Sequence, residues 1–193
     1  MQETNACRSG FSLTTPPATS SEPAVGLESE VPSTGTLIIG YGSPIRGDDA
    51  IGPLAADALA AQSLPEGVRV IARHVLTAEL VEDIASAGRV IFLDAAADGA
   101  PGEVRVRELH PDATAVSTMA HFLDPRELLA WCQTLYHHEP SAWLVSAAGQ
   151  SFDYAHYRLS PPAAAALAPM LEQVQALLGA AHSISPAISS GKS

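Results

Sequence analysis

The chain has 193 residues, 47% of them hydrophobic, which is enough to bury one sizeable core but not two full domains. Its formal net charge is -11, and so acidic a surface repels phosphate backbones and anionic lipid headgroups, so nucleic acid and membrane partners are not expected. The N-terminus lacks a signal-peptide pattern and no stretch is apolar enough to span a bilayer, so the expected location is the cytoplasm.

The two ends of the chain differ in composition from its middle. Residues 1–35 and 180–193 are rich in small and polar residues and in proline, so they bury too little apolar surface to offset the entropy of ordering them. We expect both to be disordered extensions of one domain at residues 36–179. Cys7 falls in the first extension and Cys132 in a predicted helix, which indicates neither a disulfide framework nor a cysteine zinc site, and Cys132 is expected in the core.

Apolar runs and helical patterns alternate through this middle region. Strands are expected at residues 36–41, 68–73, 89–94, 103–109 and 142–148. Helices are expected at residues 49–62, 77–87, 124–136 and 161–178. The alternation predicts an α/β fold, with a mostly parallel five-stranded sheet covered on both faces and 103–109 as an edge strand. Ligands of such sheets bind beyond the carboxyl ends of the strands, so polar residues there are candidate site residues.

The first candidate follows the first strand, in the glycine-rich segment 40–52. The glycines do not have the dinucleotide-binding spacing, and two adjacent aspartates would repel a pyrophosphate; they suit a cation instead. One aspartate is enough to cap the helix that follows, and we assign that role to Asp48. Capping does not require a second carboxylate, so Asp49 is the candidate for a functional role.

Two further candidates lie near the ends of later strands. Asp94 directly follows an apolar run, where it is either an active-site acid on a rigid support or the start of a turn. His121 lies in a small-residue loop before a helix, and a lone histidine is seldom a ligand. Together, Asp49, Asp94 and His121 would offer two oxygens and one imidazole nitrogen, a set that suits nickel, zinc or cadmium with positions left open.

Several segments together resemble the hydrogenase maturation endopeptidases. They are the glycine-turn-Asp-Asp segment 40–52, the helix entry 74–80, the strand 90–95 ending in Asp-Ala, the histidine loop and helix 117–136, and the Leu-Ser-Pro start of the last helix at 159–161. The resemblance covers essentially all of residues 36–179. Each motif is weak alone, whereas their combination is specific.

The resemblance implies a three-layer α/β/α sandwich and a metal-dependent endopeptidase. Members of this family remove a C-terminal extension from the large-subunit precursor of a nickel-iron hydrogenase after nickel insertion. Matched to this chain, their metal-binding and catalytic residues are Asp49, Asp94 and His121. The precursor, as partner, supplies the nickel, so no permanent cofactor is expected, although zinc or cadmium would fit the same donors.

The chain also departs from the family pattern. Ser43 stands where asparagine is usual, Ala50 stands where glycine is frequent, and segment 152–158 lacks the usual glycine. These departures leave two alternatives open. One is a binding module that checks metalloprotein assembly without cutting, and the other is a different hydrolase on the same fold.

Overall fold

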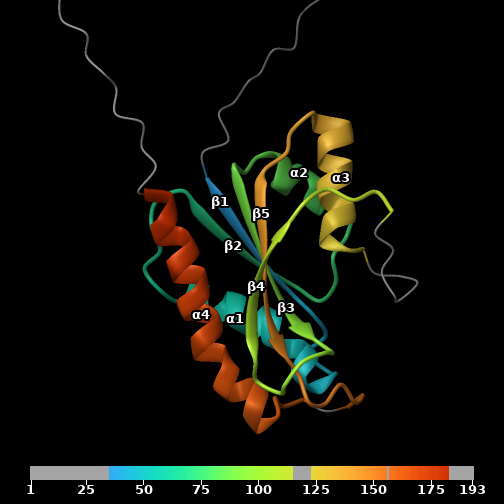
Figure 1. Cartoon of the computed structure of the whole chain (residues 1–193), viewed down its shortest axis with the longest axis vertical. Coiled ribbons are helices and arrows are strands. Elements are labelled where there is room, and N and C mark those ends of the chain that lie inside the picture. Colours follow the sequence, from blue (N-terminus) through green and yellow to red (C-terminus); the bar gives the residue numbers. More distant parts are fainter. Residues whose placement is uncertain (1–34, 115–122, 156, 183–193) are drawn as a thin grey trace, which may run out of the picture. The chain divides into compact units, whose positions relative to one another are not determined.

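Strands and helices alternate along the chain in the computed structural model, which describes residues 35–114, 123–155 and 157–182 (Figure 1). The strands are β1 (Thr36–Tyr41), β2 (Val68–Arg73), β3 (Arg89–Ala96), β4 (Val104–Leu109) and β5 (Ser141–Ala148). The helices are the 3-10 helix η1 (Gly47–Ala50) and the α-helices α1 (Ile51–Ala60), α2 (Leu80–Ala85), α3 (Pro125–Tyr136) and α4 (Pro161–His182). The predicted α/β fold class is confirmed.

The five strands form one sheet in the order β2-β1-β3-β5-β4. β1 is parallel to both β2 and β3, and β3 is parallel to β5. Only β4 is antiparallel, and it lies at the edge as predicted for residues 103–109. From β1 the chain leads to β2 on one side, and β3 then lies on the other side of β1. The carboxyl ends of β1 and β3 therefore form a switch point, where ligands of such sheets bind.

Helices cover both faces of the sheet, so the unit has three layers (Figure 1). Alternate residues of β1 show the division: Leu37 and Ile39 pack into the core under α2 and α3, whereas Ile38 packs into the core under α1 and α4. All three side chains are fully buried. Burial of a side chain of this size contributes about 1.5–3 kcal/mol, so the two apolar cores are the main source of stability.

Gly52 brings α1 very close to the sheet. A Cβ atom on Gly52 would overlap the carbonyl oxygens of Tyr41 in β1 and Leu93 in β3. Glycine is therefore required at the first turn of α1. The close approach holds the start of this helix against the carboxyl ends of β1 and β3, where the candidate residues lie.

Helix boundaries differ more from the predictions than strand boundaries do. The helix predicted at 49–62 begins as the 3-10 helix η1 before continuing as α1. The helix predicted from residue 77 begins only at Leu80, because the amides of Leu80 and Val81 first make turn hydrogen bonds to residues 77 and 78. The last helix extends four residues beyond the predicted end at 178, to His182. The predicted extensions lie largely outside the described residues, and the domain limits at 36 and 179 stay a prediction.

None of the helices in the described part of the chain is both long enough and apolar enough to cross a membrane.

Candidate functional site

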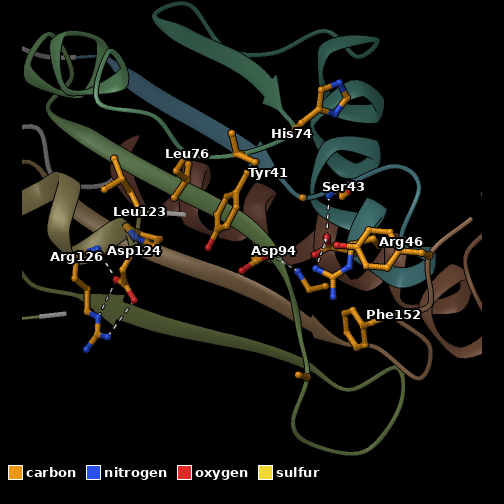
Figure 2. Close-up of a pocket in the computed structure, with 17 residues that line it drawn as sticks. Tyr41, Ser43, Arg46, His74, Leu76, Asp94, Leu123, Asp124, Arg126 and Phe152 are labelled. Carbon is orange, nitrogen blue, oxygen red and sulfur yellow. Dashed lines mark hydrogen bonds and ion pairs between the residues drawn. The ribbon is translucent and has the colours of Figure 1, made fainter. Parts of the chain in front are cut away.

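A cavity of about 640 Å³ opens at the carboxyl ends of β1 and β3. Polar and aromatic side chains form much of its lining, among them Tyr41, Ser43, Arg46, Asp49, Asp94, Asp124, Arg126 and Phe152. Figure 2 shows Ser43, Arg46 and Phe152 at one end, Asp124 and Arg126 at the opposite end, and Tyr41 and Asp94 between them. The structure thus brings Asp49 and Asp94 into one pocket, as the alternating pattern of strands and helices predicted.

The loop after β1 wraps around the Asp49 carboxylate. Gly42 has a φ angle of 139°, and a Cβ atom there would overlap the backbone carbonyl oxygen of Asp49. This residue must therefore be glycine, both for the angle and for the space. The loop places the amide of Ser43 3.0 Å from Oδ2 of Asp49, to which it donates a hydrogen bond. Nη1 of Arg46 lies 3.7 Å from the same oxygen.

The prediction that Asp48 caps the helix is wrong. Asp48 is the second residue of η1, makes no cap, and is completely buried. Its carboxylate accepts hydrogen bonds from the amides of Gln150 (2.7 Å), Ser151 (3.0 Å) and Ser160 (2.6 Å), and from the Ser160 hydroxyl (2.8 Å). Burial alone would raise the pKa of Asp48, but these four donors favour the ionised form and lower it below its usual value. Asp48 therefore ties the loop after β1 to the segment between β5 and α4.

Asp94 is partly buried within β3 rather than after it, because the strand continues to Ala96. Burial is the main cause that raises its pKa to about 7, and the nearby carboxylates of Asp49 and Asp124 raise it further. A hydrogen bond from the Tyr41 hydroxyl and one from the Ala95 amide (2.7 Å) act in the opposite direction. A carboxyl group with this pKa can gain or lose a proton near neutral pH.

Tyr41 is a pocket residue that the sequence did not single out. Its ring packs against the core and meets Phe92 edge-on, with the ring centroids 6.5 Å apart. Its hydroxyl reaches Asp94 in the pocket, as Figure 2 shows by the direction of the side chain. Burial, followed by the charge of Asp94, raises the pKa of Tyr41 well above its usual value, so the hydroxyl stays protonated and remains a donor. The sequence feature that could have identified Tyr41 is a hydroxyl-bearing side chain directly after Gly40, at the carboxyl end of a buried strand.

The opposite end of the pocket is formed by the start of α3. Asp124, where the helix was predicted to start, is its N-cap and accepts a hydrogen bond of 2.8 Å from the amide of Arg126. The guanidinium of Arg126 donates two hydrogen bonds of 3.1 Å to the Asp124 carboxylate, and its Nη1 lies 3.6 Å from Oδ2 of Asp112. The pocket is therefore lined by three aspartates and two arginines, with each arginine beside a different aspartate.

His121 lies outside the described residues, so its position relative to Asp49 and Asp94 stays a prediction. Within residues 35–114, 123–155 and 157–182, no group of three or more His, Cys, Asp or Glu side chains is arranged to hold a metal ion. His74 is exposed and also lines the pocket.

Cys132 is excluded from the chemistry of the pocket. It lies in α3, is completely buried, and belongs to the core under α2 and α3, as predicted. Burial raises the pKa of its thiol to about 11, so almost none of it is the reactive thiolate at neutral pH.

Comparison with known proteins assigns the family. Residues 54–177, more than half of the chain, match the family model HycI, described as hydrogenase maturation protease. Among solved structures, the hydrogenase maturating endopeptidase HybD from Escherichia coli is 26% identical, with a TM-score of 0.67 over 76% of this chain and 93% of that one. A hydrogenase 2 maturation peptidase from a Thaumarchaeota archaeon is also 26% identical, with a TM-score of 0.57 over 76% and 99% of the two chains.

A third structure supports the fold alone. The NiFe hydrogenase maturation protease HycI from Thermococcus kodakarensis is 22% identical, with a TM-score of 0.61 over 77% of this chain and 95% of that one. No curated protein sequence matches the chain. The family match and the shared fold together show that the chain belongs to the hydrogenase maturation protease family and is a maturation endopeptidase.

Proposed function

We propose that this endopeptidase removes the C-terminal extension of a nickel-iron hydrogenase large-subunit precursor in the cytoplasm, after nickel has been inserted. The family supports the reaction class. The observation that carries the proposal is the placement of Asp49, in η1 after β1, and Asp94, in the neighbouring strand β3, in one pocket at the switch point of the sheet. A cavity of about 640 Å³ has room for a peptide segment as well as an ion.

In this proposal nickel enters the pocket as part of the precursor and is recognised by Asp49, Asp94 and His121. Two carboxylates and an imidazole suit a borderline divalent ion, and zinc or cadmium would satisfy the same donors. The Asp94 carboxyl is already oriented by Tyr41 and by the Ala95 amide, which supports its assignment as a ligand. The ion would act as a Lewis acid toward the scissile carbonyl or the attacking water.

We assign the remaining chemistry to residues of this chain. Asp94 would hold the ion, and its pKa of about 7 describes only the metal-free pocket, because a bound divalent ion keeps the carboxyl ionised. Asp49, held by the Ser43 amide, is the second carboxylate and our candidate for the general base. Phe152 and Leu123, both partly buried in the wall of the pocket, cover the bound peptide and limit access of bulk water.

Two substitutions test these assignments. Asp94→Asn and His121→Ala proteins should leave the precursor uncut at times when the wild-type protein has processed it completely, a loss of about 100-fold or more in rate. Electrophoretic mobility and intact mass of the precursor measure this. Normal processing by both variants would remove Asp94 and His121 from the mechanism. Stable binding of the precursor by the wild-type protein without any mass change would instead favour the assembly-checkpoint alternative.

A further inference from the structure

Arg46 lies where an incoming cation would meet Asp49. Its Nη1 is 3.7 Å from Oδ2 of Asp49, the oxygen that also accepts the Ser43 amide, and both residues line the pocket. The side chains of Arg46 and Asp49 are only 17% and 21% exposed, so water screens this pair less than a pair on the open surface. The guanidinium is thus the resident positive charge at this end of the pocket.

The pairing is fixed by the surrounding backbone. Arg46 and Asp49 are joined across a single turn, in which the Asp49 amide donates to the Arg46 carbonyl oxygen at 3.2 Å. Asp48, which lies between them in this turn, accepts four hydrogen bonds from the segment between β5 and α4. That same segment places the ring of Tyr154 5.3 Å from the Arg46 Cζ atom, a cation–π contact. The backbone turn and the ring of Tyr154 therefore both hold the guanidinium beside Asp49.

We propose that Arg46 is an internal counter-ion that a metal ion must displace before it can bind to Asp49. The inference rests on the proposed function, because it takes Asp49 as a metal ligand. A free divalent ion gains only its own coordination, and part of that gain is lost in breaking the Arg46–Asp49 pair. Nickel that arrives within the precursor is accompanied by binding of the polypeptide, which offsets the loss. Arg46 thereby makes the site selective for precursor-borne metal over free metal.

The test is a calorimetric titration of Cd²⁺, and separately of Ni²⁺, into the isolated full chain in the absence of precursor. Arg46→Gln should bind the ion about fivefold or more tightly than the wild type, the effect of removing a partly screened charge pair of about 1 kcal/mol. Arg46→Lys, which keeps the charge, should stay within about twofold of the wild type. Tyr154→Leu should give a smaller gain, of about twofold. Tyr154 is 75% exposed, so its substitution leaves the fold intact.

Arg126→Gln is the matched control. Arg126 lines the same pocket and carries the same charge, but its carboxylate partners are Asp124 and Asp112. Its loss should change the affinity by less than about twofold. The double variant Arg46→Gln/Asp49→Asn should lose the gain, which shows that the titration reports on Asp49.

The inference is overturned by unchanged or weaker metal binding in folded Arg46→Gln protein, by an equal gain in Arg126→Gln, or by a gain that survives in the double variant. Circular dichroism establishes folding in each case. Failure of the proposed function gives a different result, because the wild-type protein then leaves nickel-loaded precursor uncut. Wild-type cleavage combined with no gain in Arg46→Gln rejects the counter-ion role alone.

Discussion

The carboxyl group of Asp94 has an environment that opposes its ionisation. Burial is the larger cause, and two further carboxylates, Asp49 and Asp124, add to it. Metal ligands and proton-transfer groups share this need for a carboxyl that is held in place and incompletely solvated. Tyr41 and the Ala95 amide provide the opposing hydrogen bonds, so the pKa of about 7 is a balance between burial with nearby carboxylates and these two donors.

This balance predicts how stability depends on pH in the metal-free protein. The folded state keeps the Asp94 proton up to about pH 7, whereas an ordinary aspartate loses it near pH 3.8. The folded state therefore binds more protons in this interval, and stability falls as pH rises through it. Relative to Asp94→Asn, the free energy of unfolding of the wild type should fall by about 2–4 kcal/mol between pH 4 and pH 8. Urea denaturation in chelator-treated buffer measures this difference.

Comparison with the variant is essential because Asp48 acts in the opposite direction. The lowered pKa of Asp48 contributes stability that is lost in acid, and this contribution is present in both proteins. The difference between the two curves thus isolates Asp94. Parallel curves from pH 4 to pH 8 would show that the pKa of Asp94 in the folded protein is that of an ordinary aspartate, and would refute the raised pKa.

At the level of elements, the Asp48 carboxylate connects η1 to the start of α4. Replacing it by alanine leaves three backbone amides and the Ser160 hydroxyl without their buried acceptor. Asp48→Ala should therefore lower the free energy of unfolding by about 3 kcal/mol or more, measured by urea denaturation at pH 7. Asp57→Ala, at an exposed position of α1, is the control and should change it by less than about 0.5 kcal/mol. Equal effects of the two substitutions would show that the hydrogen bonds of Asp48 do not stabilise the fold.

The strands were predictable and the Asp48 connection was not, for a physical reason. β1, β3 and β5 are buried on both faces, so each leaves a continuous apolar run in the sequence. The partners of Asp48 lie 102 to 112 residues further along the chain. The residues near Asp48 in the sequence indicate only the helix that follows it, so they predict that Asp48 caps this helix, a common role of aspartate there. Tyr41 was missed for the same reason, because its hydroxyl contacts Asp94 on another strand.

Helix starts were the other weak point of prediction. The segment from residue 77 has helical spacing of apolar residues, yet its first three residues form a turn before α2. The spacing of apolar side chains indicates only which side chains are buried. A turn before a helix can bury the same side chains, so the spacing does not show where the helix begins. By contrast, Asp124 was placed correctly at the start of α3, because an Asp-Pro pair signals a cap and a first helical residue.

For the whole molecule, the order of strands in the sheet explains why the two carboxylates meet. Asp49 and Asp94 are 45 positions apart by their numbering, but β1 and β3 are neighbours in the sheet. The rule that ligands bind at the carboxyl ends of such strands predicted their meeting from the sequence alone. His121 was placed at the same end by that reasoning and by the family resemblance, and its position stays a prediction.

The proposal that this endopeptidase recognises metal carried by its substrate is tested most directly by the intact mass of the large-subunit precursor. Nickel-loaded and nickel-free precursor are each incubated with the wild-type chain and with Asp94→Asn protein. We expect only nickel-loaded precursor to lose a C-terminal peptide, and only with the wild-type chain. Cleavage of nickel-free precursor at the same rate, or cleavage by Asp94→Asn protein, would contradict it.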